Sequence, residues 1–320
     1  MGVEISLQVI QTCAGIVGVV GNTLVCVVIN RVKPMHTLTN SLIFNQAVID
    51  LLGSLLTLVT ANVGVPHPLS GWSGELYCRV WESKFFIWAF FASSTFSLTA
   101  LTLERYFAII FPFLYKRWFS KTMVALIITA VWVLGCVSSI YNLTYIVFDG
   151  HDSCVSVTHE NSQVVGTMLF LFEYAIPLGV MLYAYIHITI VLKRSVRRIG
   201  GEGNVVTTVH HQQEASAGGG QAASLVRARK NVFKTLFIVF CCFAICWTPN
   251  KIIFFMFNFG WPLDFNGALY VISVALVVSN SAINPIIYAI KYRQFRRGFC
   301  IMVGRARLSD NCDVFLNTTG

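Results

Sequence analysis

The chain has 320 residues, of which 56% are hydrophobic and only 12% charged, and its mean hydropathy is +0.68. A soluble domain carries about 25% charged residues, and a disordered chain is polar and poor in aromatic residues, so both classes are excluded. The net charge of +9 falls in short loops between apolar runs, which argues against a nucleic-acid-binding domain. The composition predicts an all-α membrane protein.

Seven apolar runs are long enough to cross a bilayer as helices, because a span needs about 20 mostly apolar residues. The predicted spans are residues 5–30, 38–63, 79–110, 122–146, 164–192, 230–258 and 265–290. The first span would serve as its own insertion signal. We expect residues 1–302 to form one seven-helix domain and 303–320 a short tail. A flexible, glycine-rich loop is expected at about 194–227, with basic ends that extend the flanking helices.

Lysine and arginine fix the expected orientation, since cytoplasmic loops of membrane proteins are enriched in them. With the N-terminus outside, the outer half holds only Arg79, Lys84 and Lys251 of the 23 basic residues. We therefore expect an external N-terminus and a cytoplasmic C-terminus. The outer side is then rich in acid: Glu4, Glu75, Glu82, Asp149, Asp152, Glu160 and Asp264.

Two of the ten cysteines, Cys78 and Cys154, fall in predicted outer loops. The economical prediction is one disulfide between them, in the oxidising compartment, and the alternative is two free thiols. The alternating run 154–158 is compatible with a short strand in a hairpin over a pocket mouth. Asn142-Leu-Thr is a glycosylation sequon near the outer end of the fourth span, close to the bilayer.

Polar residues inside the spans are costly and therefore indicate function. They form a series of motifs, which are Gly21-Asn22, Asn45-Gln-Ala-Val-Ile-Asp50, Glu104-Arg105-Tyr106, Cys246-Trp-Thr-Pro249 and Asn284-Pro-Ile-Ile-Tyr288. In this order on seven spans, the motifs resemble those of the rhodopsin-like (class A) G-protein-coupled receptors. The resemblance covers about residues 20–300. Phe295 and Arg296 resemble the start of the short amphipathic eighth helix of that family.

The resemblance implies a seven-transmembrane helix bundle in the plasma membrane. Such a receptor binds an extracellular ligand and activates a heterotrimeric G protein, and arrestin is a further expected partner. The chain would not be an enzyme, since no catalytic triad or metal-ligand spacing falls in one compartment. A transporter or a channel is the alternative hypothesis from another functional class. The sequence shows no internal repeat and no row of charges that would line a pore, so nothing supports this hypothesis.

Ten residues match the coupling and switch positions of the family: Glu104, Arg105, Tyr106, Phe113, Tyr185, Trp247, Pro249, Asn284, Pro285 and Tyr288. By resemblance, Arg105 rests on Glu104 or swings to Tyr185 and Tyr288. The alternatives are an arginine that extends to the membrane surface, prolines that serve only as architectural kinks, and a Phe113 that contacts the membrane. Cys300 follows the eighth helix and is a candidate for palmitoylation, with a free buried thiol as the alternative.

The resemblance also implies an allosteric sodium site and no other cofactor. The five residues at its matching positions are Asn22, Asp50, Ser94, Asn280 and Ser281. The alternative is a protonated Asp50 in a hydrogen-bond network without an ion. Two departures from the family are visible. Arg229 stands where many relatives carry an acid that pairs with Arg105, which predicts raised basal activity. The spacing from Cys78 to Arg105 is two residues longer than usual, so the register of the outer part of the third span stays open.

The residues expected to line the ligand pocket are Ile87, Trp88, Phe91, Glu173, Trp247, Lys251, Phe254 and Tyr270. By resemblance to the family fold, Glu173 and Lys251 face each other across the ligand cavity, either as an ion pair or as a split pair that grips a zwitterionic or amide-rich ligand. The alternative is that Glu173 faces a neighbouring helix and Lys251 extends outward.

Two ligand classes are disfavoured by residue type. Val278 stands where retinal would need a lysine, and Ile87, about eighteen residues before Arg105, stands where amine receptors carry an aspartate. The acidic outer side and a resemblance to neuropeptide receptors favour a short peptide, basic or amidated. A constitutively active receptor and a receptor for a lipid or small metabolite remain alternatives.

Overall fold

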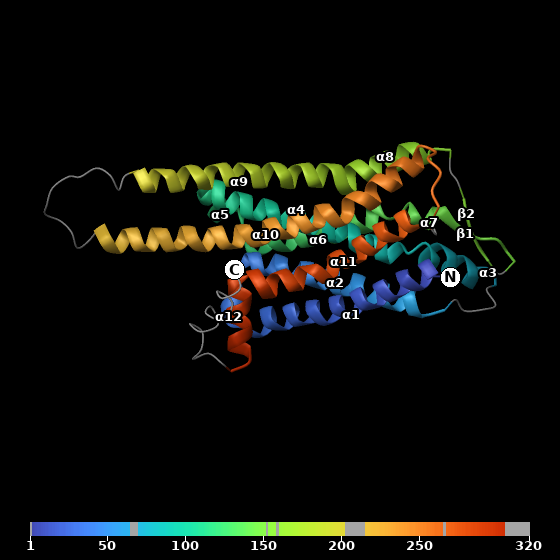
Figure 1. Cartoon of the computed structure of the whole chain (residues 1–320), viewed down its shortest axis with the longest axis horizontal. Helices are drawn as coiled ribbons and strands as arrows, with labels where there is room; N and C mark the ends of the chain where they lie inside the picture. Colours follow the sequence, from blue (N-terminus) through green and yellow to red (C-terminus); the bar gives the residue numbers. More distant parts are fainter. Residues whose placement is uncertain are drawn as a thin grey trace.

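A computed structural model describes residues 2–64, 70–151, 153–157, 160–201, 215–264 and 267–304. Within these residues, seven helical segments are long and apolar enough to cross a membrane. Their bounds are Ile5–Arg31, Leu38–Asn62, Gly71–Ile110, Lys121–Tyr145, Ser162–Arg194, Phe233–Asn258 and Ala268–Lys291. They lie side by side along one axis (Figure 1). The predicted multi-pass helix bundle is confirmed.

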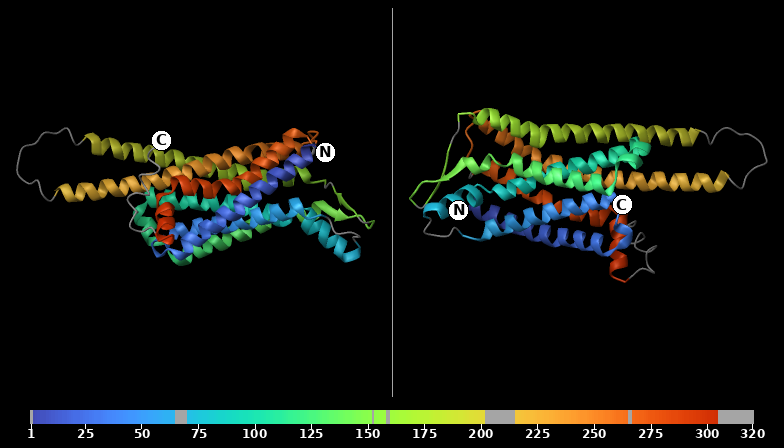
Figure 2. Two further views of the ribbon diagram at one scale, coloured as in Figure 1. Left: turned by 60° about the horizontal axis from the view of Figure 1, so that its bottom comes forward. Right: turned by 180° about the vertical axis from the view of Figure 1, so that it is seen from behind.

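The long helices are α1 (Gly2–Arg31), α2 (Leu38–Asn62), α4 (Phe85–Ile110), α6 (Lys121–Ser138), α9 (Ile176–Gly201), α10 (Ala215–Asn258) and α11 (Ala268–Lys291). Shorter helical turns precede or connect them: η1 (Lys33–Met35), α3 (Gly71–Leu76), η2 (Tyr77–Glu82), α5 (Pro112–Trp118), α7 (Asn142–Tyr145), α8 (Ser162–Phe170) and η3 (Leu171–Ala175). The predicted eighth helix is α12 (Arg293–Met302), which lies across one end of the bundle (Figure 2).

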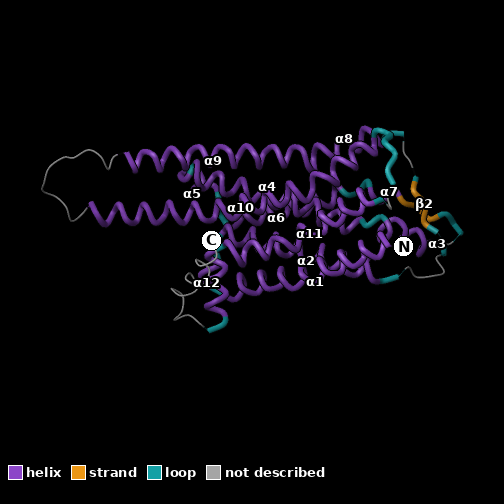
Figure 3. Tube along the Cα trace, viewed as in Figure 1, coloured by secondary structure: helices purple, strands orange, loops and turns teal. Residues whose placement is uncertain are grey.

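The strands β1 (Ile146–Phe148) and β2 (Cys154–Ser156) pair antiparallel, with Val147 opposite Val155. They lie at the opposite end of the bundle from α12 (Figure 3). We call these two ends the hairpin end and the α12 end. The expected short strand in the run 154–158 is confirmed as part of this hairpin.

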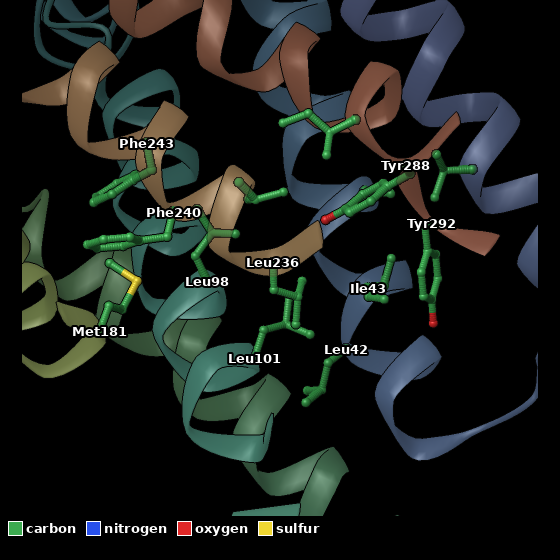
Figure 4. Close-up of a cluster of buried hydrophobic side chains, with 14 of the residues drawn as sticks. Leu42, Ile43, Leu98, Leu101, Met181, Leu236, Phe240, Phe243, Tyr288 and Tyr292 are labelled. Carbon is green, nitrogen blue, oxygen red and sulfur yellow. The ribbon is translucent and has the colours of Figure 1, made fainter. Parts of the chain in front are cut away.

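Small residues let the helices approach closely, as is common in membrane bundles. A Cβ atom added to Gly21 on α1 would lie 2.7 Å from Pro285 on α11, and one added to Gly135 on α6 would lie 2.7 Å from the carbonyl oxygen of Ala89. The buried core between α2, α4, α9, α10 and α11 is apolar. Its members include Leu42, Leu98, Leu101, Met181, Leu236, Phe240 and Phe243 (Figure 4).

The predicted fourth span, 122–146, agrees with the observed Lys121–Tyr145, within which α6 ends at Ser138 and α7 follows before β1 begins at residue 146. One predicted boundary was wrong. The loop predicted for about 194–227 is shorter: α9 continues to Gly201, and α10 already begins at Ala215. The extensions include Gly200, Gly201 and 218–220, which are poor helix formers, so helix propensity does not explain them. Residues 202–214 and 305–320, with most of the predicted tail, lie outside the described residues.

The extra length between Cys78 and Arg105 is absorbed at the start of α4. The preceding turn η2 is a π-helix, which is wider than an α-helix and takes up extra residues. Lys84 then caps α4 in the left-handed conformation, with φ of 56°, and is the one non-glycine residue with positive φ in the described part of the chain. From Phe85 onward the helix is regular, so the outer register is settled.

Lys84 gives a stability prediction. A residue with a side chain loses about 1 kcal/mol or more in the left-handed region, and a β-branched residue loses the most. We expect Lys84→Gly to be more stable than Lys84→Val by about 1–2 kcal/mol, measured as melting temperature in detergent. Equal stability of the two variants would contradict a left-handed backbone at this position.

Candidate functional site

At the α12 end, Arg105 is held by its neighbour Glu104, whose side chain is fully buried. Nε and Nη2 of Arg105 each lie 2.5 Å from a carboxylate oxygen of Glu104. Thr39 on α2 accepts a further hydrogen bond from Arg105 and donates one of 3.0 Å to Glu104. Tyr115 on α5 donates to the same carboxylate at 2.6 Å. The arginine therefore has the resting partner that the sequence predicted.

Burial and the hydrogen bond to Glu104 raise the pKa of Tyr115 to about 12. Tyr115 is therefore a neutral donor at physiological pH, and it ties the connecting helix α5 to the end of α4. Phe113 lies on the same short helix and is 87% exposed. The predicted exposure of this apolar residue is confirmed, and such a residue is typical of a docking surface.

The predicted partners of a released Arg105 are both buried, and Tyr185 is engaged elsewhere. Tyr185 packs against Phe233, Phe237 and Phe240 of α10 and shares a hydrogen bond of 3.3 Å with Thr102. The hydroxyl of Tyr288 is buried, and it has no hydrogen-bond partner among the described residues. The structure therefore does not bring Tyr185 or Tyr288 to Arg105.

The side chains between α4, α9 and α10 leave a small buried cavity, whose lining includes Leu101, Tyr185 and Phe240. Tyr106 points to the other side of α4, where its hydroxyl lies 3.0 Å from Nδ1 of His187 on α9. Tyr106 is thus separate from the contacts of Arg105.

In the middle of the bundle, Asp50 on α2 is buried among hydrogen-bond donors. Its carboxylate accepts from Ser94 at 2.9 Å, from Asn284 at 2.8 Å and from Gln46 at 3.1 Å. Asn22 on α1 lies in the adjoining layer and donates to the carbonyl oxygen of Ser281 at 3.0 Å. Side chains from α2, α4 and α11 thus meet at one carboxylate, and of the residues predicted for this site Ser94 contacts it directly.

The donor atoms in this layer suit a hard monovalent cation. No group of three His, Cys, Asp or Glu that could hold a metal occurs in the described part of the chain. Asp50 is instead contacted by two side-chain amides and one hydroxyl. Buried side-chain oxygens without a hydrogen-bond partner among the described residues occur on Asn22, Gln46, Asn280 and Asn284. Orphaned carbonyl oxygens next to a carboxylate are the ligand type that hard cations and ordered water prefer.

Gln46 was not among the residues predicted for this site. Its Nε2 atom donates to Asp50 and also to Ser94, at 2.6 Å. The signal was present in the sequence, because a residue four positions before Asp50 lies on the same face of a helix. An amide therefore already bridges two of the predicted cation ligands.

Nearer the hairpin end, Glu173 on η3 and Lys251 on α10 form an ion pair of 2.6 Å. Their side chains are 12% and 8% exposed. Nζ of Lys251 also lies 5.3 Å from the ring centre of Trp247, within the range of a cation–π contact. The ring of Phe91 meets Trp247 edge to face at 5.7 Å. The predicted ion pair is confirmed, and the alternative in which Glu173 faces a neighbouring helix and Lys251 extends outward is excluded.

Two prolines lie within the helices that carry these groups, Pro249 in α10 and Pro285 in α11. Each removes one backbone hydrogen bond and so makes a bend there easier. Beside Pro249, Thr248 is hydrogen-bonded to Tyr174 on η3. The indole nitrogen of Trp247 is buried, and it has no hydrogen-bond partner among the described residues. α10 is therefore joined to η3 at two consecutive positions of that turn, Glu173 and Tyr174.

For the remaining predicted pocket residues, the structure records no direct contact with the ion pair of Glu173 and Lys251. Trp88 meets Phe91 at 6.1 Å between ring centres, and Ile87 belongs to the buried core. Phe254 and Tyr270 are half-buried on α10 and α11. Of the eight predicted pocket residues, the structure thus joins Trp88, Phe91, Trp247, Lys251 and Glu173 through successive contacts.

The profile of the 7 transmembrane receptor (rhodopsin family) matches residues 21–288, from within α1 to within α11. The chain is a rhodopsin-family receptor. Similar receptors cover most of its length. Galanin receptor 2b of Danio rerio is 26% identical over 318 residues, which are 95% of this chain and 78% of the relative. Neuromedin-U receptor 2 of Rattus norvegicus is 30% identical over 302 residues, 89% of this chain and 71% of the relative.

Neuromedin-K receptor of Cavia porcellus is 30% identical over 294 residues, 88% of this chain and 61% of the relative. These relatives are receptors and not enzymes. The predicted resemblance to neuropeptide receptors of class A is therefore confirmed. It was carried by the motifs of all seven spans and by the pattern of the outer loops.

The receptor has the predicted disulfide between Cys78 and Cys154, which joins η2 to β2. Asn142 begins the short helix α7 at the hairpin end and is half-buried, and its glycosylation stays a prediction. Cys300 is buried on α12, and its palmitoylation stays a prediction. The side chain of Arg229 lies outside the described residues.

Proposed function

We propose that this receptor binds a short extracellular peptide and, on binding it, activates a heterotrimeric G protein. The observation that carries the proposal is the buried pair of Glu173 and Lys251 beside Trp247, because charged groups in this position offer a ligand strong, oriented contacts. The names of the similar receptors, for galanin, neuromedin U and neuromedin K, support a peptide.

We further propose that the receptor lies in the plasma membrane with its hairpin end outside. The basic residues support this orientation, since Arg31, Lys116, Arg117 and Arg293 all lie at the α12 end. The disulfide at the hairpin end is typical of an oxidising compartment. Arrestin binding and glycosylation of Asn142 are proposals that follow from the family and from this orientation.

The function is tested by measuring G-protein dissociation in cells that express the chain, first without ligand and then with a library of short peptides. A dose-dependent response that is lost in Glu173→Gln or Lys251→Gln would support a peptide receptor. A high signal without ligand and no peptide response would favour a constitutively active receptor. Silence throughout, with the receptor at the surface, would contradict the peptide proposal and favour a lipid or small metabolite.

We propose in addition that the layer around Asp50 holds a sodium ion. Asp50, Ser94 and the orphaned oxygens of Asn22 and Asn280 would hold it, with Ser281 supplying its carbonyl to orient Asn22. A bound cation would supply positive charge that keeps Asp50 ionised. Because Nε2 of Gln46 donates to both Asp50 and Ser94, this amide competes with a cation for the same oxygens.

The sodium proposal predicts opposite effects for two variants. The purified receptor should melt a few degrees higher in sodium chloride than in choline chloride of equal ionic strength. We expect Asp50→Asn to abolish this difference, because it removes the charge. We expect Gln46→Leu to increase it, because the competing amide is gone. An equal salt effect on the wild type and on Asp50→Asn would contradict a specific site.

A further inference from the structure

The ion pair of Glu173 and Lys251 occupies the centre of the proposed ligand pocket. Its atoms are 2.6 Å apart, and both side chains are almost completely buried. Neither residue makes a second ion pair among the described residues. Each charge therefore depends on the other for its neutralisation.

Burial makes this mutual dependence strong. Two charges that leave water lose their hydration, and their attraction compensates for this only while both are present and in contact. Removing one partner leaves an uncompensated buried charge, which is strongly unfavourable. A ligand that separates the pair must therefore replace both partners, with a positive group for Glu173 and a negative group for Lys251.

The ion pair also contacts neighbours on α10, the helix that contains Pro249. Nζ of Lys251 lies over the ring of Trp247, and this ring contacts Phe243 at 6.1 Å between centres. At the neighbouring position on η3, Tyr174 is hydrogen-bonded to Thr248. The ion pair of Glu173 and Lys251 and the hydrogen bond between Tyr174 and Thr248 both join η3 to α10 next to Pro249. Separating the ion pair thus removes one of two adjacent links and moves a charge away from Trp247.

We propose that in the resting receptor the ion pair of Glu173 and Lys251 fills the position that the ligand takes, and that the activating ligand is dipolar. This inference rests on the proposed peptide-receptor function. The ligand would present a cation to Glu173 and a carboxylate to Lys251, as a free peptide C-terminus beside a basic side chain does. An amidated C-terminus lacks the charge that Lys251 needs.

The charge at the hairpin end agrees with a ligand of net positive charge. The exposed or half-buried acids near this end are Glu75, Glu82, Asp149, Glu160 and Asp264, against Arg79 and Lys84. Such an excess attracts cations from solution and raises their association rate. The acidic surface thus favours peptides of net positive charge, whereas the buried pair favours peptides with one end that carries both a positive and a negative group.

The first test needs no ligand. Melting temperature and ligand-free G-protein dissociation are measured for Glu173→Gln, Lys251→Gln, the double variant and the exchanged variant Glu173→Lys/Lys251→Glu. We expect each single variant to lose on the order of 5 °C and to change basal signalling, and the double variant to lose less than the sum. The exchanged variant should recover part of the loss. Additive single effects without recovery would overturn the resting pair.

The matched control is the more exposed ion pair of Glu75 and Arg79, in which Nε of Arg79 lies 2.7 Å from the carboxylate of Glu75. Its side chains are both 42% exposed, so Glu75→Gln and Arg79→Gln should shift the melting temperature little. A comparable loss in this control would mean that charge removal in general, and not burial of the Glu173–Lys251 pair, causes the effect.

The second test uses a library of tetrapeptides made twice, once with a free C-terminal carboxylate and once with a C-terminal amide. We expect activating sequences to be at least about tenfold more potent as free acids, which corresponds to one lost ionic contact. Lys251→Gln should remove this preference. Equal potency of acid and amide would overturn the dipolar ligand while leaving the peptide function intact. Silence of both libraries would refute the peptide function, and the dipolar ligand with it, while the first test still decides the resting pair.

Discussion

Replacing Arg105 by alanine is expected to abolish G-protein activation at unchanged surface expression. The guanidinium makes two charge-assisted hydrogen bonds to Glu104 and one to Thr39, all of which it can transfer to a partner in the active state. Two such bonds are worth about 3 kcal/mol or more, a factor of roughly 100 in an equilibrium. Glu104 keeps its hydrogen bonds from Thr39 and Tyr115 in the variant, so the fold should survive.

The opposite effect is expected for Glu104→Gln. This change removes the charge that holds Arg105 at rest, and we expect ligand-free signalling to rise by about tenfold. G-protein dissociation at matched surface expression measures both variants. Arg31→Ala, an exposed arginine at the same end of the bundle, is the control. Full signalling by Arg105→Ala would show that the switch lies elsewhere.

The second large effect is expected on removal of the disulfide. Cys78 and Cys154 are 76 residues apart in sequence, and closing a loop of this length restricts the unfolded chain by about 4 kcal/mol in the loop-entropy model. The bond also fixes the hairpin to η2, and Phe148 of β1 packs against Gly74 on the preceding helix α3. We expect Cys78→Ser and Cys154→Ser to lose most surface expression and the peptide response.

A free cysteine provides the control for this prediction. Cys13 on α1 is exposed and carries a free thiol, so Cys13→Ser should leave the melting temperature unchanged. The double variant Cys78→Ser/Cys154→Ser should be no worse than either single variant, because both lose the same bond. Normal surface expression of the double variant would mean that the hairpin is held by packing alone.

The spans and their order were predictable because a bilayer imposes the length and composition of each helix. The ends of the helices were less so. Nothing in the apolar run that begins at residue 122 indicates that α6 ends at Ser138 and that residues 146–148 form β1. Strand pairing with residues 154–156 decides this, and it depends on a partner that is distant in sequence.

The candidate site shows the same division. Glu173 and Lys251 could be predicted to meet because each has a fixed distance from a proline that marks its helix, Pro177 and Pro249. That the pair is closed, and lies beside Trp247, depends on side-chain packing that no sequence pattern contains. The resemblance to the family assigned the cation site without Gln46. The spacing of four residues between Gln46 and Asp50 nevertheless indicated that the two side chains share one face of the helix.

The left-handed Lys84 has a consequence for comparing this receptor with its relatives. Because η2 and Lys84 take up the two additional residues, positions in α4 keep a constant offset from Arg105 only as far out as Phe85. Ile87 lies inside this regular part, so its equivalence to the aspartate of amine receptors holds. Positions before Lys84 must be counted from Cys78 instead. An alignment with a single gap-free third helix would shift Trp72 and Cys78 by two places and assign their neighbours to the wrong side of the pocket.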